Sequence, residues 1–196
     1  RGVFTGEKTL YIHANFVKEI TEAIHFSKKY KVAKMVIIGG YDAWMVAEML
    51  KENNIAVILK RVHSLPERQE EDVYLPYKMP KILQDADVLF CLENSGDMEA
   101  MGTRNLPFYA GTAVAYGVEK ETALQLITLN TAKILGIDKT CGSLELGKDA
   151  TLFISDGDAL DMRTNKVTTA FIQGRLIDVD NHQKKLYRKY SKKYEE

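Results

Sequence analysis

Four short apolar runs, each followed by a stretch with helical periodicity, constrain the fold of this chain more than any other feature of its sequence. The runs occupy residues 9–14, 34–40, 55–59 and 87–92. Helices are expected after them: the first ends near residue 30, and the others are at residues 42–53, 77–86, 105–116 and 119–135. Alternation of strands and helices is typical of right-handed βαβ units around a parallel sheet. We therefore predict an α/β fold with a parallel sheet.

The strand–helix rhythm changes beyond residue 136. Residues 142–154 and 167–179 are predicted to be strands joined by turns, because glycines punctuate the apolar stretches there. Residues 183–196 contain six Lys or Arg residues among a leucine and three tyrosines at helical spacing, which are Leu186, Tyr187, Tyr190 and Tyr194. We expect an amphipathic helix that packs its tyrosines on the domain, with a basic surface for nucleic acid or a membrane as the alternative. These features predict a main α/β domain at residues 1–140, a small β segment at 141–182 and a C-terminal helix at 183–196.

Charge balance and cysteine content limit the partners and the compartment. The chain carries 27 Lys+Arg and 27 Asp+Glu residues, so its formal net charge is zero. Because phosphate binding needs a net basic face, a small-molecule substrate is expected as the partner, not nucleic acid. No apolar run approaches the roughly 18 residues of a membrane span, and no signal peptide opens the sequence. Cys91 and Cys141 have no metal-binding spacing, so we predict a cytoplasmic protein with two buried, reduced thiols.

Polar side chains follow the apolar runs at the points where strands should end. His13 closes the first run, and the loop after the third run contains His63. Ligands of parallel α/β folds bind beyond the carboxyl ends of the strands, so both histidines are candidates for a site. A neutral imidazole at residue 13 could bind a divalent metal or act as a base, unless it is a structural, half-buried histidine. His63 begins a long charged loop, residues 61–76, which either covers a site or is simply solvated.

The fourth run ends in Glu93, the first of three carboxylates that include Asp97 and Glu99. Such a group could orient a water molecule or bind a hard cation. The same segment could instead be a turn before a helix capped by Asn105. Arg104 could bind a substrate carboxylate through two parallel hydrogen bonds, or it could pair with Glu99.

The second run ends in Gly39 and Gly40. Their spacing matches neither of the glycine-rich phosphate-binding motifs, so a phosphate-binding loop is not predicted. A doubly wound nucleotide-binding domain, which shares the strand–helix rhythm, is therefore the weakest of the alternatives.

Three stretches in the second half of the chain carry a family resemblance. The sequence GSLELGKDATLFI at residues 142–154 is similar to a GSLE-GKDADL signature, and ETALQLITLNTAKILG at 121–136 is similar to an EALxxxTxNpAkiLG helix. Both patterns are typical of the amidohydrolase superfamily. The sequence RNLPFYAGTAVAYG at residues 104–117 resembles the imidazolonepropionase-like branch of that superfamily. Together the resemblance covers most of residues 9–180.

The resemblance implies a (β/α)8 barrel joined to a β-sandwich that both chain ends build. The predicted strands would be barrel strands five to eight, which is half of the barrel, and residues 141–182 would be a small β-sandwich segment. A complete barrel needs roughly 250 residues, and the family's first-strand His-x-His pair has no counterpart here. Arg1 is therefore expected to begin the C-terminal portion of a longer chain. Because half a barrel leaves strand edges unpaired, a homo-oligomer formed through those edges is also expected.

The resemblance also implies roles for individual residues, in a family that uses one or two metals, usually zinc. His13 matches the fifth-strand metal-binding histidine, and Gly39 stands where the sixth-strand histidine is expected. Glu93 stands at the position of the eighth-strand aspartate, which binds metal and moves protons; His63 and Arg104 would contact substrate. The implied reaction is attack of metal-activated water on the carbonyl carbon of a cyclic amide-like substrate. This chain by itself supplies too few ligands to bind zinc tightly or to be active.

A second hypothesis follows from the missing sixth-strand histidine. With Gly39 at that position, the protein could be a catalytically degenerate family member that serves as a binding or scaffold module.

Overall fold

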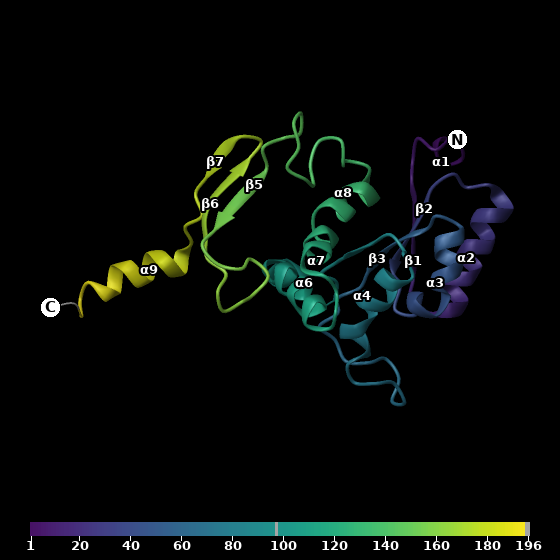
Figure 1. Ribbon diagram of the computed structural model, residues 1–196, viewed down its shortest axis with the longest axis horizontal. Coiled ribbons are helices and arrows are strands. Elements are labelled where there is room, and N and C mark those ends of the chain that lie inside the picture. The colour runs from purple at the N-terminus through teal and green to yellow at the C-terminus, as the bar shows by residue number, and fades with distance from the viewer. Residues whose placement is uncertain (97, 195–196) are drawn as a thin grey trace. The chain divides into compact units, whose positions relative to one another are not determined.

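The computed structural model describes residues 1–96 and 98–194, which belong to two compact units, Arg1–Ser143 and Leu144–Glu196. The fold is mixed α/β. The first unit contains a parallel sheet with its helices, and the second contains an antiparallel sheet and one helix (Figure 1). No helix in the described part of the chain is long and apolar enough to cross a membrane.

Four parallel strands form the centre of the first unit. They are β1 (Leu10–Ala14), β2 (Met35–Gly39), β3 (Ala56–Leu59) and β4 (Phe90–Leu92), in the spatial order β1-β2-β3-β4. The parallel sheet predicted from the apolar runs is thus confirmed. The fourth strand begins three residues later than predicted, because Asp87 adopts a left-handed φ of 56° in the turn that follows the preceding helix.

Helices connect the strands. They are α2 (Val17–Tyr30), the 3-10 turn η1 (Ala43–Val46) with α3 (Ala47–Glu52), and α4 (Leu75–Asp85). Right-handed crossovers place successive helices on the same face of a sheet. On that face, Ile37, Val57 and Phe90 lie level with one another and are at most 2% exposed. A short helix that the sequence did not predict, α1 (Gly2–Thr5), precedes β1.

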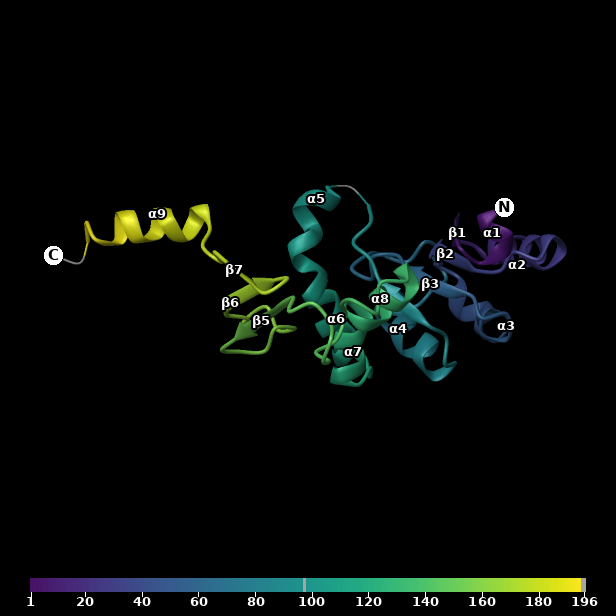
Figure 2. The same cartoon turned by 90° about the horizontal axis from the view of Figure 1, so that it is seen from above.

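Between β4 and residue 135, the regular elements of the described residues are all helices. Its elements are α5 (Glu99–Gly102), η2 (Thr103–Asn105), α6 (Leu106–Ala115), α7 (Lys120–Leu126) and α8 (Leu129–Leu135) (Figure 2). The sequence predicted a single helix over 119–135, but the structure divides it at residues 127–128. Thr128 leaves the helical region, with φ −131° and ψ −89°, and its hydroxyl donates to the Leu124 carbonyl at 2.7 Å.

The division allows α8 to pack on the other face of the sheet, which we call the open face and which carries His13, Ile38, Ile58 and Cys91 at one level. Near the start of the strands, Ile134 of α8 joins a hydrophobic cluster that includes Cys91. Toward the carboxyl ends of the strands the cover is thinner, and Ile38 and Ile58 are only half-buried. The two faces of the sheet are therefore buried to different extents.

The second unit contains three antiparallel strands and a helix. They are β5 (Leu152–Ser155), β6 (Val167–Ile172), β7 (Arg175–Ile177) and α9 (His182–Ser191), with the strands in the order β5-β6-β7. Gln173 and Gly174 form the tight turn between β6 and β7, and both have the positive φ that a two-residue hairpin turn requires. The strand predicted over residues 142–154 is wrong for its first ten residues. Gly142 and Gly147 both have positive φ there, and the chain forms turns.

Two expectations about burial are also corrected. Of the two cysteines predicted to be buried, Cys91 is buried and Cys141 is only half-buried. Burial raises the pKa of the Cys91 thiol to about 11. The tyrosines of the predicted C-terminal helix are exposed, and α9 has no buried residue among those described. Residues 195–196 of that predicted helix lie outside the described part of the chain.

Candidate functional site

The carboxyl ends of the four parallel strands bring His13 and Glu93 to the same face of the sheet. His13 lies level with Cys91 in the strand register, and side chains two residues apart on a strand share a face. The strand ladder continues to Glu93, whose backbone N–H donates to the Leu59 carbonyl at 3.0 Å. Glu93 therefore extends the open face beyond Cys91, toward the end at which ligands of parallel sheets bind.

The electrostatics of Glu93 show which charges surround it. Burial raises the pKa of its carboxyl group, because a half-buried carboxylate loses hydration. A hydrogen bond with Ser95 and the positive charges of His13 and Lys60 act in the opposite direction and lower the pKa. Glu93 thus retains a raised pKa although His13 and Lys60 lie near enough to act on it.

Lys60 was not among the residues expected from the sequence, although it directly follows the apolar run of β3. Its ammonium group forms an ion pair with Glu67 at 2.6 Å and lies 5.4 Å from the centre of the Tyr41 ring. The sequence does contain a signal for Lys60, because this polar residue directly follows the last apolar residue of the strand. The loop predicted from the sequence, residues 61–76, begins one residue later and does not include it.

His63 is held between the loop after β3 and helix α6. Its Nε2 lies 2.6 Å from the hydroxyl oxygen of Thr112, and that hydroxyl donates its own proton to the Phe108 carbonyl at 3.0 Å. Nε2 must therefore be the donor, which leaves the lone pair on Nδ1 when the ring is neutral. Burial, with a contribution from Arg61, lowers the pKa of His63. The ring of Tyr109 packs against it at 4.6 Å, and no hydrogen bond or ion pair among the described residues joins His63 to Glu93.

Arg104 lies apart from these groups. It is exposed in η2, and its alternative ion pair with Glu99 does not form in the described structure. Asn105 occupies the N-cap position of α6 as expected, but its side chain makes no capping hydrogen bond. Asp97, the third carboxylate expected in this segment, lies outside the described residues.

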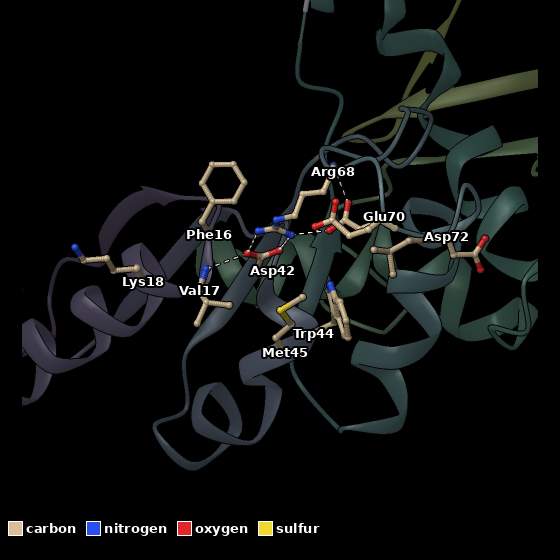
Figure 3. Close-up of a pocket in the computed structure, with 11 residues that line it drawn as sticks. Phe16, Val17, Lys18, Asp42, Trp44, Met45, Arg68, Glu70 and Asp72 are labelled. Carbon is tan, nitrogen blue, oxygen red and sulfur yellow. Dashed lines mark hydrogen bonds and ion pairs between the residues drawn. The ribbon is translucent and has the colours of Figure 1, made fainter.

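The long loop after β3 is fixed by a network that the sequence analysis missed. Asp42, at the end of β2, is only 1% exposed and binds both terminal nitrogens of Arg68, at 2.9 and 2.6 Å (Figure 3). Arg68 also binds Glu71 at 2.6 Å, and the Tyr41 hydroxyl donates to the same carboxylate. Burial alone would raise the pKa of Glu71, but its hydrogen bonds with Tyr41 and Arg68 outweigh burial and lower it. The loop is therefore held in place rather than merely solvated.

At the end of β2, positions 39 and 40 leave no room for a side chain. A Cβ atom on Gly39 would lie 2.4 Å from Oδ1 of Asn15, and one on Gly40 would lie 2.7 Å from a methyl group of Val57. Both glycines have positive φ, 101° and 61°, which residues with a Cβ adopt only under strain. The carboxamide of Asn15 occupies the space where a side chain on residue 39 would begin, and its buried Oδ1 has no hydrogen-bond partner among the described residues.

These observations test whether the chain could hold the metal that the family resemblance implies. The described residues contain no group of three or more His, Cys, Asp or Glu side chains that could bind one metal ion. His13 and Glu93 could contribute ligands, but Gly39 cannot, and a catalytic zinc site takes three protein ligands. The residues described here therefore do not fit a complete metal centre.

Comparison with known proteins gives the family. Residues 78–177 match the model of the amidohydrolase family. Because the match covers half of the sequence, the chain belongs to the amidohydrolase family, as the motifs at residues 104–154 indicated.

Two relatives illustrate the range of the similarity. An imidazolonepropionase of Flavobacterium psychrophilum (strain ATCC 49511 / DSM 21280 / CIP 103535 / JIP02/86) is 24% identical over 184 residues, which are 82% of this chain and 45% of the relative. Adenine deaminase 3 of Rhizobium meliloti (strain 1021) is 32% identical over 65 residues, which are 33% of this chain and 10% of the relative. The chain thus spans less than half the length of the curated relatives it matches.

Solved structures agree with the family assignment. An amidohydrolase from Thermotoga maritima MSB8 is 26% identical and superposes with a TM-score of 0.78 over 90% of this chain and 45% of its own. An adenosine deaminase from Xanthomonas campestris, solved with bound zinc, is 16% identical with a TM-score of 0.58. At that identity the second likeness shows the fold alone. It covers 96% of this chain and 51% of the deaminase.

Proposed function

We propose that this chain is the C-terminal half of a (β/α)8 barrel, with β1 to β4 as barrel strands five to eight, in a hydrolase that cleaves a C–N bond of a cyclic amide-like substrate. Family membership and relatives that act on C–N bonds support the reaction class. The parallel order β1-β2-β3-β4 and the 45% coverage of the Thermotoga structure support the assignment as half of a barrel.

The observation that carries the proposal is the state of Glu93. Its carboxyl group stands at the carboxyl end of β4, half-buried and with a raised pKa, on the face that also carries His13. A half-buried carboxyl group with a raised pKa is suited to take and return a proton during one reaction cycle.

In the proposed reaction, Glu93 moves the proton. As a carboxylate it takes a proton from the attacking water while the water oxygen bonds to the carbonyl carbon of the substrate. As a carboxylic acid it then gives that proton to the leaving nitrogen, and the C–N bond breaks. One water molecule is consumed, and Glu93 returns to its starting state. Lys60 helps to keep Glu93 ionised before water attacks, because its positive charge opposes the effect of burial.

Substrate contacts and the metal remain proposals. His63, neutral and with a free Nδ1, and Arg104, exposed in η2, are proposed to contact the substrate. A divalent metal, zinc first, is proposed for the complete enzyme, with His13 and Glu93 as this chain's ligands. The described residues do not complete such a centre, so the proposed proton transfers do not involve a metal.

The experiment replaces Glu93 by Gln in the longest natural polypeptide that carries this sequence. Hydrolysis of cyclic amides and amino-purines, followed by proton NMR, is expected to fall by roughly 10²-fold or more, the usual contribution of a general acid–base group. In the unmodified protein, kcat/KM should fall as the pH drops through the raised pKa of Glu93, because the carboxylate is the base. Glu48→Gln, on the exposed surface of α3, should leave the activity unchanged. Equal activity of the Glu93→Gln and Glu48→Gln proteins would reject the role of Glu93.

A second candidate function is a binding or scaffold module without hydrolysis. The glycine turn at Gly39 and Gly40 favours it, because this turn removes one expected metal ligand and fills its space with Asn15. Metal analysis of the same polypeptide after supplementation separates the candidates. Stoichiometric zinc, manganese or iron supports the hydrolase, and metal-free protein without hydrolytic activity supports the scaffold.

A further inference from the structure

A cavity of about 700 Å³ lies outside the strand-end site, among the start of α2, the 3-10 turn η1 and the loop before α4 (Figure 3). All of its lining residues belong to the first unit, and none of them is His13, Lys60 or Glu93. Its volume is within the range of pockets that hold small organic ligands. No role in the proposed hydrolysis is assigned to it.

The floor of this cavity is apolar. Phe16, Trp44, Met45 and Leu75 contribute to its lining. Phe16 is 41% exposed and Met45 is 47% exposed, so two large apolar side chains face solvent within one concave surface. A flat apolar ligand would remove this surface from water, and the exposed ring of Phe16 provides a face on which a ring can stack.

The positive charge of Arg68, which lines the cavity, is already paired with two carboxylates. The guanidinium group of Arg68 is bound by Asp42 and by Glu71, and it lies 5.4 Å from the centre of the Phe16 ring. A guanidinium with two carboxylate partners has little capacity left for an anionic ligand. Lys18 is the other cationic residue of the lining, and because four carboxylates line the same cavity, an acidic ligand is not the expected occupant.

The rim carries unbalanced negative charge. Four carboxylates line the cavity, against two cationic side chains, those of Lys18 and Arg68. Asp72 pairs with Lys78, whereas Glu70 is exposed and forms no ion pair within the described part of the chain. A protonated amine would find a partner in Glu70 and would be attracted by the remaining negative charge of the rim.

The cavity also contains an unused hydrogen-bond donor. The indole Nε1 of Trp44 is buried and has no partner among the described residues. Figure 3 shows this nitrogen on the edge of the indole ring that points toward Arg68 and Glu70. Buried donors without a partner are costly, so the position is suited to a ligand that brings a hydrogen-bond acceptor.

We propose that this cavity binds an aromatic amine, with a flat ring stacked on Phe16, a protonated amino group at Glu70, and an oxygen on the ring that accepts the Trp44 N–H. Each part of the ligand corresponds to a separate observation. The ring matches the apolar lining, the amino group matches Glu70, and the oxygen matches the Trp44 N–H. The site is independent of the proposed hydrolysis and of the metal.

Four small phenyl compounds test the three parts separately. Tyramine carries the ring, the amine and the oxygen; 4-ethylphenol lacks the amine; phenethylamine lacks the oxygen; and 4-hydroxyphenylacetate carries the opposite charge. Trp44 is the only tryptophan of the chain, so its fluorescence reports occupancy directly, with calorimetry as the second measurement. Tyramine is expected to bind roughly two- to fivefold more tightly than 4-ethylphenol, the range that an exposed ion pair supplies. The acid is expected to bind most weakly.

Matched variants link these preferences to residues. Glu70→Gln should remove the preference for tyramine over 4-ethylphenol, whereas Glu22→Gln, an exposed carboxylate of α2 away from the cavity, should keep it. Trp44→Phe, followed by calorimetry, should remove the preference for tyramine over phenethylamine. The proposal is overturned if tyramine changes neither fluorescence nor heat at millimolar concentration. Equal binding of tyramine and 4-ethylphenol, or equal behaviour of the two glutamate variants, would overturn it as well.

Discussion

Gly39 illustrates how one residue limits the chemistry at the end of a strand. The sequence showed only that a glycine stands where the family has a histidine. In the structure, its φ of 101° and the contact that its Cβ would make with Asn15 exclude a side chain in the present backbone. The change is therefore built into the local backbone together with Asn15, and a single reverse substitution does not undo it.

Gly39→His should lower the free energy of unfolding by about 1–3 kcal/mol, the cost of a strained backbone position, and should not create zinc binding. Asn15→Ala in the same protein should recover part of the loss, because it removes the closest atom. Gly136→His is the control and should lower the free energy of unfolding less, since Gly136 also has positive φ but nothing within 4 Å of its Cβ. Urea denaturation measures all three proteins. A Gly39→His protein that is as stable as the parent and binds zinc would contradict this account.

His63 is the residue whose protonation should affect stability near neutral pH. Its pKa is lowered in the folded protein from an ordinary value of 6.5, mainly by burial. The unfolded chain therefore binds a proton at a higher pH than the folded chain does. The resulting stabilisation is present above the unfolded pKa and is lost as the pH falls through 6.5 toward the folded value.

The free energy of unfolding should consequently decrease between about pH 7.5 and pH 5.5. His63→Gln should reduce this decrease, whereas His25→Gln, on the exposed surface of α2, should not. Urea titrations at a series of pH values provide the measurement. A pH dependence that is the same in the His63→Gln and His25→Gln proteins would show that His63 is not its source.

At the scale of elements, the loop between β3 and α4 depends on side chains that are distant in sequence. Arg68 reaches back to Asp42 at the end of β2, and Asp42 also accepts the Val17 N–H at the start of α2, at 3.1 Å. One buried carboxylate thus joins the turn after β2, the loop after β3 and the start of α2. From its length alone, the loop was predicted either to cover a site or to be solvated. These contacts show that it is fixed in position.

Arg68→Met should destabilise the protein and loosen residues 61–74, because it leaves the Asp42 carboxylate buried without its counter-ion. Lys51→Met breaks the exposed pair with Asp87 and should change the free energy of unfolding by no more than about 0.5 kcal/mol. Thermal unfolding and amide hydrogen exchange compare the two variants. Equal effects of both substitutions would show that the Asp42–Arg68 pair does not hold the loop.

At the scale of the whole molecule, the unequal burial of the two sheet faces suggests what the chain associates with. The helix-covered face is closed, whereas the open face leaves Ile38 and Ile58 half-buried, and β1 pairs only with β2 among the described strands. Exposed apolar flanks and free strand edges favour association with another sheet. We propose that the isolated chain forms homo-oligomers through these edges and this face.

Sedimentation of the isolated 196-residue chain should therefore show concentration-dependent association. Ile38→Lys places a charge on the open face and should shift the equilibrium toward monomer. Phe26→Lys, at an exposed apolar position of α2, should not. A stable, compact monomer at all concentrations, or equal effects of the two substitutions, would contradict association through the open face.

The sequence by itself determined the strand–helix alternation, the parallel sheet and the family, because apolar periodicity and local motifs are properties of neighbouring residues. It also placed His13 and Glu93 at strand ends. The tertiary structure alone decided the rest. The closure of residue 39 by Asn15 and the Asp42–Arg68 pair join residues that are distant along the chain, and the division of the helix at Thr128 lets α8 pack on a sheet formed far earlier in the sequence. Such contacts depend on which side chains the folded backbone brings together, and the pattern of neighbouring residues in the sequence does not contain this information.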